Sequence, residues 1–217
     1  MTVTKPSVPG LYVGTSGWSY PSWRPGFYPA GTKPNEFLGH YALRLPSVEL
    51  NSTGYRIPAE DQFRRWAEQT PAGFRFAVKM QAYQLRQAAT FEERVRLLGE
   101  GLGPIRILVG QARDEGFLTL ALGSLDPERR IAFDFRHDSW AGIELPQNAV
   151  RINDVDAKAS FRYLRFREPP YSERAIARIA EEIRPLLESG IEVYCYFRHE
   201  GEPTAPRYAE RLLELSA

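Results

Sequence analysis

Three carboxylates stand in or directly after short apolar stretches that are typical of buried strands. Glu49 and Asp134 lie within such stretches, and Asp154 ends another. Burying a charge is costly unless the charge is paired, so each of these side chains needs a partner or a function. Two carboxylates brought close together acquire different pKa values and can divide the roles of general acid and base. We therefore predict Glu49 and Asp134 as catalytic groups and Asp154 as a ligand-binding group.

Basic side chains form a second set, in or after predicted strands. They are Lys79, Arg136, Arg165, Arg167 and Arg198. Guanidinium groups bind carboxylate or phosphate through paired hydrogen bonds, so their convergence predicts a pocket for an anionic ligand. In this interpretation Lys79 and Arg136 stabilise charge during catalysis, and the other arginines bind the ligand. The alternative is that these arginines pair with Glu49 or Asp134 or point into solvent. For the carboxylates, a role as ion-pair partners is as open as a catalytic role.

Aromatic and neutral polar side chains complete the predicted site. The aromatic members are Trp18, Tyr20, Tyr55 and Trp140, all in or near predicted loops. Such rings could stack on sugars or bases, or they could fill the loop layer above the core. Asn51 shares a strand face with Glu49, and His137 follows the strand that carries Asp134. We expect both to contact the ligand.

Metal-ligating residues are sparse along the chain. The three histidines do not cluster, and Cys195 is the single cysteine. A zinc site requires several His or Cys ligands, so we predict no transition-metal site and no cofactor. Binding of a hard cation such as Mg²⁺ remains an open alternative, because carboxylate oxygens are its preferred ligands.

The elements that would position these residues alternate between strand and helix. Strands are predicted at 11–16, 47–51, 74–79, 105–109, 130–136, 149–154, 161–167 and 191–197. Helices are predicted at 35–42, 58–69, 91–98, 117–125, 172–188 and 206–215. This order predicts an α/β fold with parallel strands, and eight units predict a (β/α)₈ TIM-type barrel. The segments after the fifth and sixth strands are too short for full helices, so we expect a trimmed barrel with those two helices reduced to loops.

Composition sets the broader class. The chain has 217 residues, a formal net charge of +1 and 43% hydrophobic residues, which is ordinary for a globular protein. A single cysteine excludes an intrachain disulfide, and no apolar run is long enough for a signal peptide or a membrane span. We therefore expect a cytoplasmic protein with a flexible N-terminus at 1–10 and a single barrel domain at 11–217. The oligomeric state is not predicted.

Five motifs run in order along the chain and together resemble the DUF72 (YecE-like) family. They are Gly-Thr-Ser-Gly-Trp at 14–18, Phe-Tyr-Pro at 27–29, Val-Glu-Leu-Asn-Ser-Thr at 48–53, Phe-Arg-Phe-Ala-Val-Lys at 74–79 and Asp-Phe-Arg-His-Asp-Ser-Trp at 134–140. The resemblance implies a TIM-barrel fold and implies no particular activity. The family pattern has Glu where Asp134 stands, a Thr-His pair after the lysine strand where 81–87 has no histidine, and Gln-Leu-Pro where Val-Gly-Gln stands at 109–111.

We predict an enzyme of hydrolytic or general acid–base type that acts on a small anionic ligand at the C-terminal mouth of the barrel, where TIM-barrel sites lie. This enzyme, which could be a hydrolase of phosphoesters or glycosides, is the first of three hypotheses. The second is a non-catalytic module that binds nucleic acid or a regulatory ligand. The third is a glycosidase-like barrel, which needs two carboxylates flanking an open cleft.

Overall fold

The computed structural model describes residues 8–199 and 201–217, and within them the chain forms eight parallel strands. The strands are β1 (Leu11–Thr15), β2 (Ser47–Leu50), β3 (Arg75–Gln81), β4 (Leu102–Val109), β5 (Ile131–Phe135), β6 (Ala149–Arg151), β7 (Phe161–Phe166) and β8 (Glu192–Phe197). They pair as two sheets, with the order β2-β3-β4-β5-β6 in one and β1-β8-β7 in the other. The succession of neighbours follows the chain, as in a (β/α)₈ arrangement.

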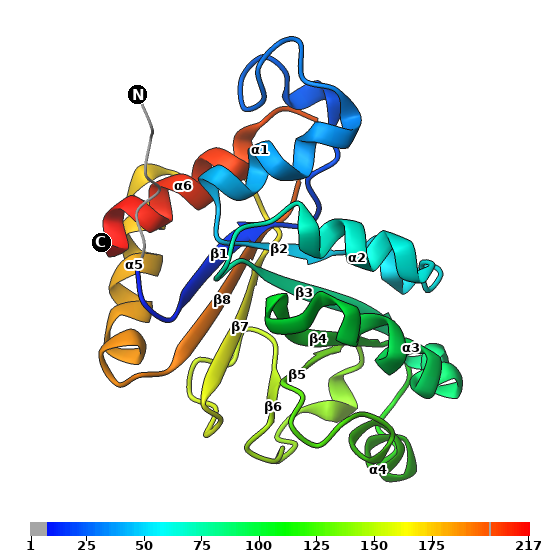
Figure 1. Cartoon of the computed structure of the whole chain (residues 1–217). Coiled ribbons are helices and arrows are strands. Elements are labelled where there is room, and N and C mark those ends of the chain that lie inside the picture. The colour runs from blue at the N-terminus through cyan, green and yellow to red at the C-terminus, as the bar shows by residue number, and fades with distance from the viewer. Residues whose placement is uncertain (1–7, 200) are drawn as a thin grey trace.

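Six α-helices cover the outside of the strands (Figure 1). They are α1 (Phe37–Arg44), α2 (Glu60–Glu68), α3 (Ala88–Val95), α4 (Glu115–Ser124), α5 (Glu173–Glu188) and α6 (Thr204–Ser216). Helix α6 packs on α5 and β1, and α5 packs on β8. Their sequences show why, since α5 buries Ile176, Ala180 and Ile183 on one face at helical spacing.

Two seams join the sheets through individual hydrogen bonds rather than through a continuous ladder. At the β1–β2 seam, Thr15 N donates to the hydroxyl oxygen of Tyr41 (2.8 Å), and that hydroxyl donates to Ser47 O (2.9 Å). Gly14 is required there, because a Cβ at this position would lie 1.9 Å from Ser47 O. A parallel bridge between Ser16 and Glu49 extends the same seam.

Asn153 connects the sheets at the second seam, between β6 and β7. Its backbone N donates to Tyr163 O (2.9 Å), and its side-chain oxygen accepts from Arg165 N (2.7 Å). Asn153 has a positive φ of 60°, a conformation that asparagine tolerates better than most residues. Strand β6 ends at Arg151, just before Asn153 and three residues before its predicted end at 154.

The predicted α/β fold and its trimming are confirmed. Between β5 and β6 only one short 3₁₀ turn forms (Asp138–Trp140), and between β6 and β7 no helix forms. Several boundaries differ by three residues: besides the early end of β6, helix α3 starts early at Ala88, and β4 starts early at Leu102 and includes Pro104. The register of β3 and β4 shifts between Phe76 and Val78, and this bulge accommodates a residue that has no N–H to donate.

The predicted flexible N-terminus falls mostly outside the described residues. From residue 8 on, Val8 packs on the hydrophobic core, and Gly10 O accepts from Val193 N at 2.8 Å. The division of the chain into a short tail and a single domain stays a prediction.

Candidate functional site

A buried arginine lies at the centre of the ionic layer inside the barrel. Arg106 on β4 is 2% exposed, and its Nη1 donates to Asp134 Oδ2 on β5 at 2.7 Å. Its Nε forms an ion pair with Glu49 Oε1 on β2 at 3.1 Å, and its Nη2 donates to Asn51 Oδ1 at 3.4 Å. One guanidinium therefore connects the carboxylates of two strands across the sheet.

Glu49 is fully buried and both of its carboxylate oxygens are bonded. The hydroxyl of Tyr163 donates to Oε1 at 2.6 Å, and Arg165 Nη2 donates to Oε2 at 2.7 Å. Burial alone would raise the pKa of Glu49, but Arg106, Arg165 and the Tyr163 hydrogen bond lower it to about 2. Glu49 is ionised at neutral pH and holds two guanidinium groups in place. Its predicted acid or base role stays a prediction.

Asp134 is the second buried carboxylate and collects three arginines. Besides Arg106, Arg136 Nε lies 2.9 Å from Oδ1, and Arg167 Nη2 donates to Oδ2 at 2.6 Å. The side chain of Arg136 is 44% exposed, so its outer edge remains available at the mouth. The buried Nε atoms of Arg165 and Arg167 have no hydrogen-bond partner among the described residues.

A cavity of about 560 Å³ lies over this layer at the ends of β5, β6 and β7. Four arginines line it, at positions 136, 151, 165 and 167, together with two carboxylates, Asp134 and Glu168. Arginines outnumber carboxylates two to one on its walls. Such a cavity favours an anion, because guanidinium groups form charge-assisted bonds to carboxylate and phosphate oxygens.

Lys79 on β3 adds a cation that has no carboxylate partner within ion-pair distance in the described chain. Its ammonium lies 4.9 Å from the ring centroid of Tyr55, and its stem packs on Gly54, where a Cβ would come within 2.7 Å of Cδ. Burial and the charge of Arg106 lower the pKa of Lys79, while Glu49 opposes the shift. A desolvated lysine with a lowered pKa is a typical feature of functional sites.

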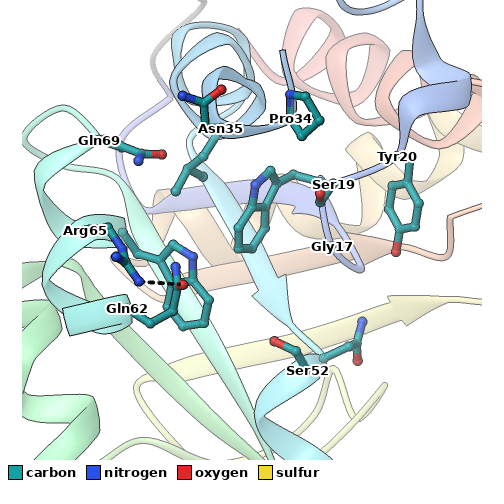
Figure 2. A pocket seen from close by; sticks show the side chains of 13 residues that line it. Gly17, Ser19, Tyr20, Pro34, Asn35, Ser52, Gln62, Arg65 and Gln69 are labelled. Atoms are coloured by element: carbon teal, nitrogen blue, oxygen red, sulfur yellow. Dashed lines mark hydrogen bonds between the residues drawn. The ribbon is translucent and has the colours of Figure 1, made fainter. Parts of the chain in front are cut away.

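Trp18, Tyr20 and Asn51 line a separate pocket beside the mouth, between the β1–α1 loop and α2 (Figure 2). The hydroxyl of Tyr20 donates to Ser16 O at 2.7 Å. Burial, and then Glu49 and Tyr55, raise the pKa of Tyr20 to about 12, so the phenol stays protonated. Tyr55 itself is largely exposed.

Four other predicted residues lie away from the ionic layer. Trp140 is fully buried, stacks on Phe135 and donates from Nε1 to Gln111 O at 2.9 Å. His137 Nδ1 accepts from Ser139 N, which starts the 3₁₀ turn at 138–140. Asp154 lines a different cavity, beside residues 142–145 and 156–158. Arg198 follows β8, and its backbone N donates to Phe166 O. Contact of these residues with a ligand stays a prediction.

Three residues of the site were not predicted from the sequence: Arg106, Tyr163 and Arg151. A signal for Arg106 exists, since it is the single charge in the apolar stretch Ile-Arg-Ile-Leu-Val at 105–109. A charge in such a strand must find buried partners. Tyr163 has a weaker signal, because it alternates with Arg165 on one strand face.

The described residues contain no group of three His, Cys, Asp or Glu side chains placed to hold a metal ion. Mg²⁺ binding stays a prediction. Cys195 is fully buried, and burial raises the pKa of its thiol, which disfavours the reactive thiolate. Over the same part of the chain, every helix is too short or too polar to cross a membrane.

Comparison with known proteins identifies similar sequences. The profile of the DUF72 family, described as a protein of unknown function, matches residues 12–217. YunF of Bacillus subtilis strain 168 is 34% identical over 178 residues, which cover 79% of this chain and 57% of YunF. YecE of Escherichia coli strain K12 is 38% identical over 80 residues, which cover 36% of this chain and 26% of YecE. The chain thus spans little more than half of one curated relative and about a quarter of the other.

Solved structures show the same fold at low sequence identity. A DUF72 family protein from Enterococcus faecalis V583 superposes with a TM-score of 0.78 at 17% identity, covering 95% of each chain. A DUF72 family protein from Thermotoga maritima MSB8 gives a TM-score of 0.73 at 22% identity, covering 94% of this chain and 98% of that one. These likenesses support the fold.

Proposed function

This chain belongs to the DUF72 family, and we propose that the mouth of its barrel binds a ligand that carries a phosphate or carboxylate group. The observation that supports this most is the charge imbalance of the cavity, where four arginines face Asp134 and Glu168. Lys79 adds a further cation beside Arg106. An anion would neutralise the excess, and the outer edges of Arg136 and Arg167 are free to bind it.

We further propose that the protein is an enzyme of hydrolytic or general acid–base type, located in the cytoplasm. The lowered pKa of Lys79 suits a proton donor or acceptor better than an ordinary lysine, because proton transfer is most efficient when the pKa lies near the working pH. Arg136 and Arg167 would stabilise charge that develops on the ligand. Glu49 and Asp134 would hold these cations in position.

The two carboxylates themselves favour this proposal over a glycosidase. In glycosidases the acid and its partner flank the scissile bond in an open cleft. Here Glu49 and Asp134 are 0% and 1% exposed, and both contact the same guanidinium of Arg106. A sugar bond cannot lie between them without displacing a buried arginine.

A thermal-shift titration with inorganic phosphate and with sulfate tests the anion site. A ligand at about 100 times its Kd adds about 2.7 kcal/mol of stability, which is readily measured. We expect a rise in Tm beyond that given by chloride at equal ionic strength, and we expect Arg136→Ala to abolish it. Arg211→Ala is the matched control, because its side chain is 41% exposed, pairs with Glu173 on helix α5 and is not among the residues that line the cavity.

Equal shifts in Arg136→Ala, Arg211→Ala and the unchanged protein would refute the proposed site. A second titration series with short oligonucleotides tests the nucleic-acid hypothesis, because the affinity of a protein for a phosphate backbone falls steeply as the salt concentration rises. Turnover of phosphoesters, measured with Mg²⁺ and with EDTA, decides between an enzyme and a binding module.

A further inference from the structure

A second pocket, of about 610 Å³, opens beside the ionic layer and is not used by the anion site (Figure 2). Its walls come from the β1–α1 loop at 17–20, from residues 34, 35 and 38, from the turn at 51–52 and from helix α2. These segments lie at and beside the C-terminal ends of β1 and β2, where ligands of such barrels bind.

The pocket is rich in carboxamides and has one charged lining residue, which is ion-paired. Asn35, Asn51, Gln62 and Gln69 line it, and its single charged residue, Arg65, pairs with Asp61 at 2.9 Å. Within the described chain, the side chains of Asn35 and Gln69 make no hydrogen bond. A carboxamide offers one acceptor and two donors, which matches the mixed donor and acceptor character of hydroxyl groups. The wall is therefore suited to a neutral ring that carries several hydroxyls.

The aromatic side chains of the pocket favour a sugar over a nucleobase. Trp18 and Trp66 meet edge to face, with ring centroids 5.7 Å apart and an interplanar angle of 88°. Two perpendicular rings cannot hold a flat base between parallel faces. A single indole can still pack against the apolar C–H face of a sugar ring, and Trp18 lines the pocket.

Asn51 connects this pocket with the ionic layer. Its side-chain oxygen accepts from Arg106 Nη2 at 3.4 Å, so its NH₂ group is left to donate to a ligand. The turn that follows Asn51 carries Gly54 and Tyr55, against which Lys79 packs. A ring in the pocket therefore lies next to the turn that holds the unpaired lysine.

We propose that this pocket binds the neutral, hydroxyl-rich ring of an anionic sugar, whose charged group reaches the cations of the mouth. The ring subsite stands on the amides and Trp18, while the identity of the whole ligand rests on the proposed function. A sugar phosphate combines both features in one molecule.

Calorimetric titration with inorganic phosphate and with ribose 5-phosphate, glucose 6-phosphate and N-acetylglucosamine 6-phosphate tests the subsite. We expect at least one sugar phosphate to bind at least tenfold more tightly than phosphate. Gln62→Ala should remove this gain and leave phosphate affinity unchanged. Gln147→Ala, an exposed glutamine in the loop before β6, is the matched control and should change neither. Thermal unfolding of each variant establishes that it is folded.

The outcomes separate the two proposals. No affinity gain for any of the three sugar phosphates, or an equal loss for phosphate and sugar phosphate in Gln62→Ala, would overturn the ring subsite. If phosphate itself does not bind, the anion site fails. Saturation-transfer NMR with methyl glycosides of the same sugars then tests the ring subsite alone. A signal that Gln62→Ala removes would support the subsite, and the absence of any signal would overturn it.

Discussion

Replacement of Glu49 by glutamine is the sharpest test of the ionic layer. Glutamine keeps the size of the side chain and removes the charge that Arg106 and Arg165 contact at 3.1 and 2.7 Å. In this variant the guanidinium groups of Arg106 and Arg165 stay buried, but both have lost the carboxylate of Glu49 as a partner. Removing one member of a buried ion pair typically costs 3–5 kcal/mol, because the remaining charge is left uncompensated.

The pKa of Glu49 gives a second, independent value for this loss of stability. It falls from 4.5 to about 2 in the folded protein, so ionisation favours the native state. At about 1.36 kcal/mol per pKa unit, the ionised carboxylate contributes about 3 kcal/mol at pH 7. Because the folded pKa is the lower one, this contribution is complete above pH 4.5 and is lost as the pH falls toward 2. The expected difference between the unchanged protein and Glu49→Gln is about 3 kcal/mol at pH 7 and about 2 kcal/mol at pH 3.5.

Urea denaturation at the two pH values measures both numbers. Glu60→Gln is the control, because this carboxylate is 54% exposed and forms a surface pair with Arg94, for which we expect less than about 1 kcal/mol. A loss below about 1 kcal/mol at pH 7 in Glu49→Gln would show that the buried guanidinium groups do not depend on this charge. A loss that does not change between the two pH values would refute the charge-based cause.

Three further changes test other parts of the molecule. Tyr41→Phe removes the hydroxyl that bridges β1 and β2 and should cost about 1–3 kcal/mol in urea denaturation; no loss would contradict the seam. Gly14→Ala should prevent folding, because Cβ would lie 1.9 Å from Ser47 O, whereas Gly39→Ala, in open space on α1, should be neutral or stabilising. Sulfate binding at alkaline pH should take up protons, since an anion raises the lowered pKa of Lys79, and Lys79→Met should abolish this uptake when calorimetry is repeated in several buffers.

The strand order and the trimmed helices were predictable because they depend on local pattern and length. Alternating apolar strands and amphipathic helices determine a parallel arrangement, and a dozen residues between strands leave no room for a helix and its loops. The boundaries were less predictable. A proline within an apolar stretch usually indicates that a strand does not continue through it. Strand β4 nevertheless includes Pro104, because the bulge against β3 removes the need for an N–H at this position.

The site was predictable as far as it depends on charges set within strands. Glu49 pairs with Arg165, and Asp134 is joined to Glu49 through Arg106, because alternation places these side chains inside the barrel. The role of Tyr163 was not predictable, since a tyrosine in a strand carries no charge that must be paired, and only the fold brings its hydroxyl to Glu49. Loop side chains were least predictable. Trp140 lies in the core because its ring stacks on Phe135, a contact that chain position does not reveal.

The ionic layer is difficult to explain by stability alone. Replacing a buried ion pair with well-packed apolar residues is often neutral or stabilising, so the gain in stability does not by itself account for Arg106, Glu49 and Asp134. What an apolar layer could not do is hold guanidinium groups at fixed positions beneath the mouth. Asp134 orients Arg136 and Arg167 from below, and their remaining N–H groups face a cavity with too few carboxylates. This arrangement supports the proposal that the buried pairs pre-organise the exposed cations, for which an anionic ligand would supply the missing negative charge.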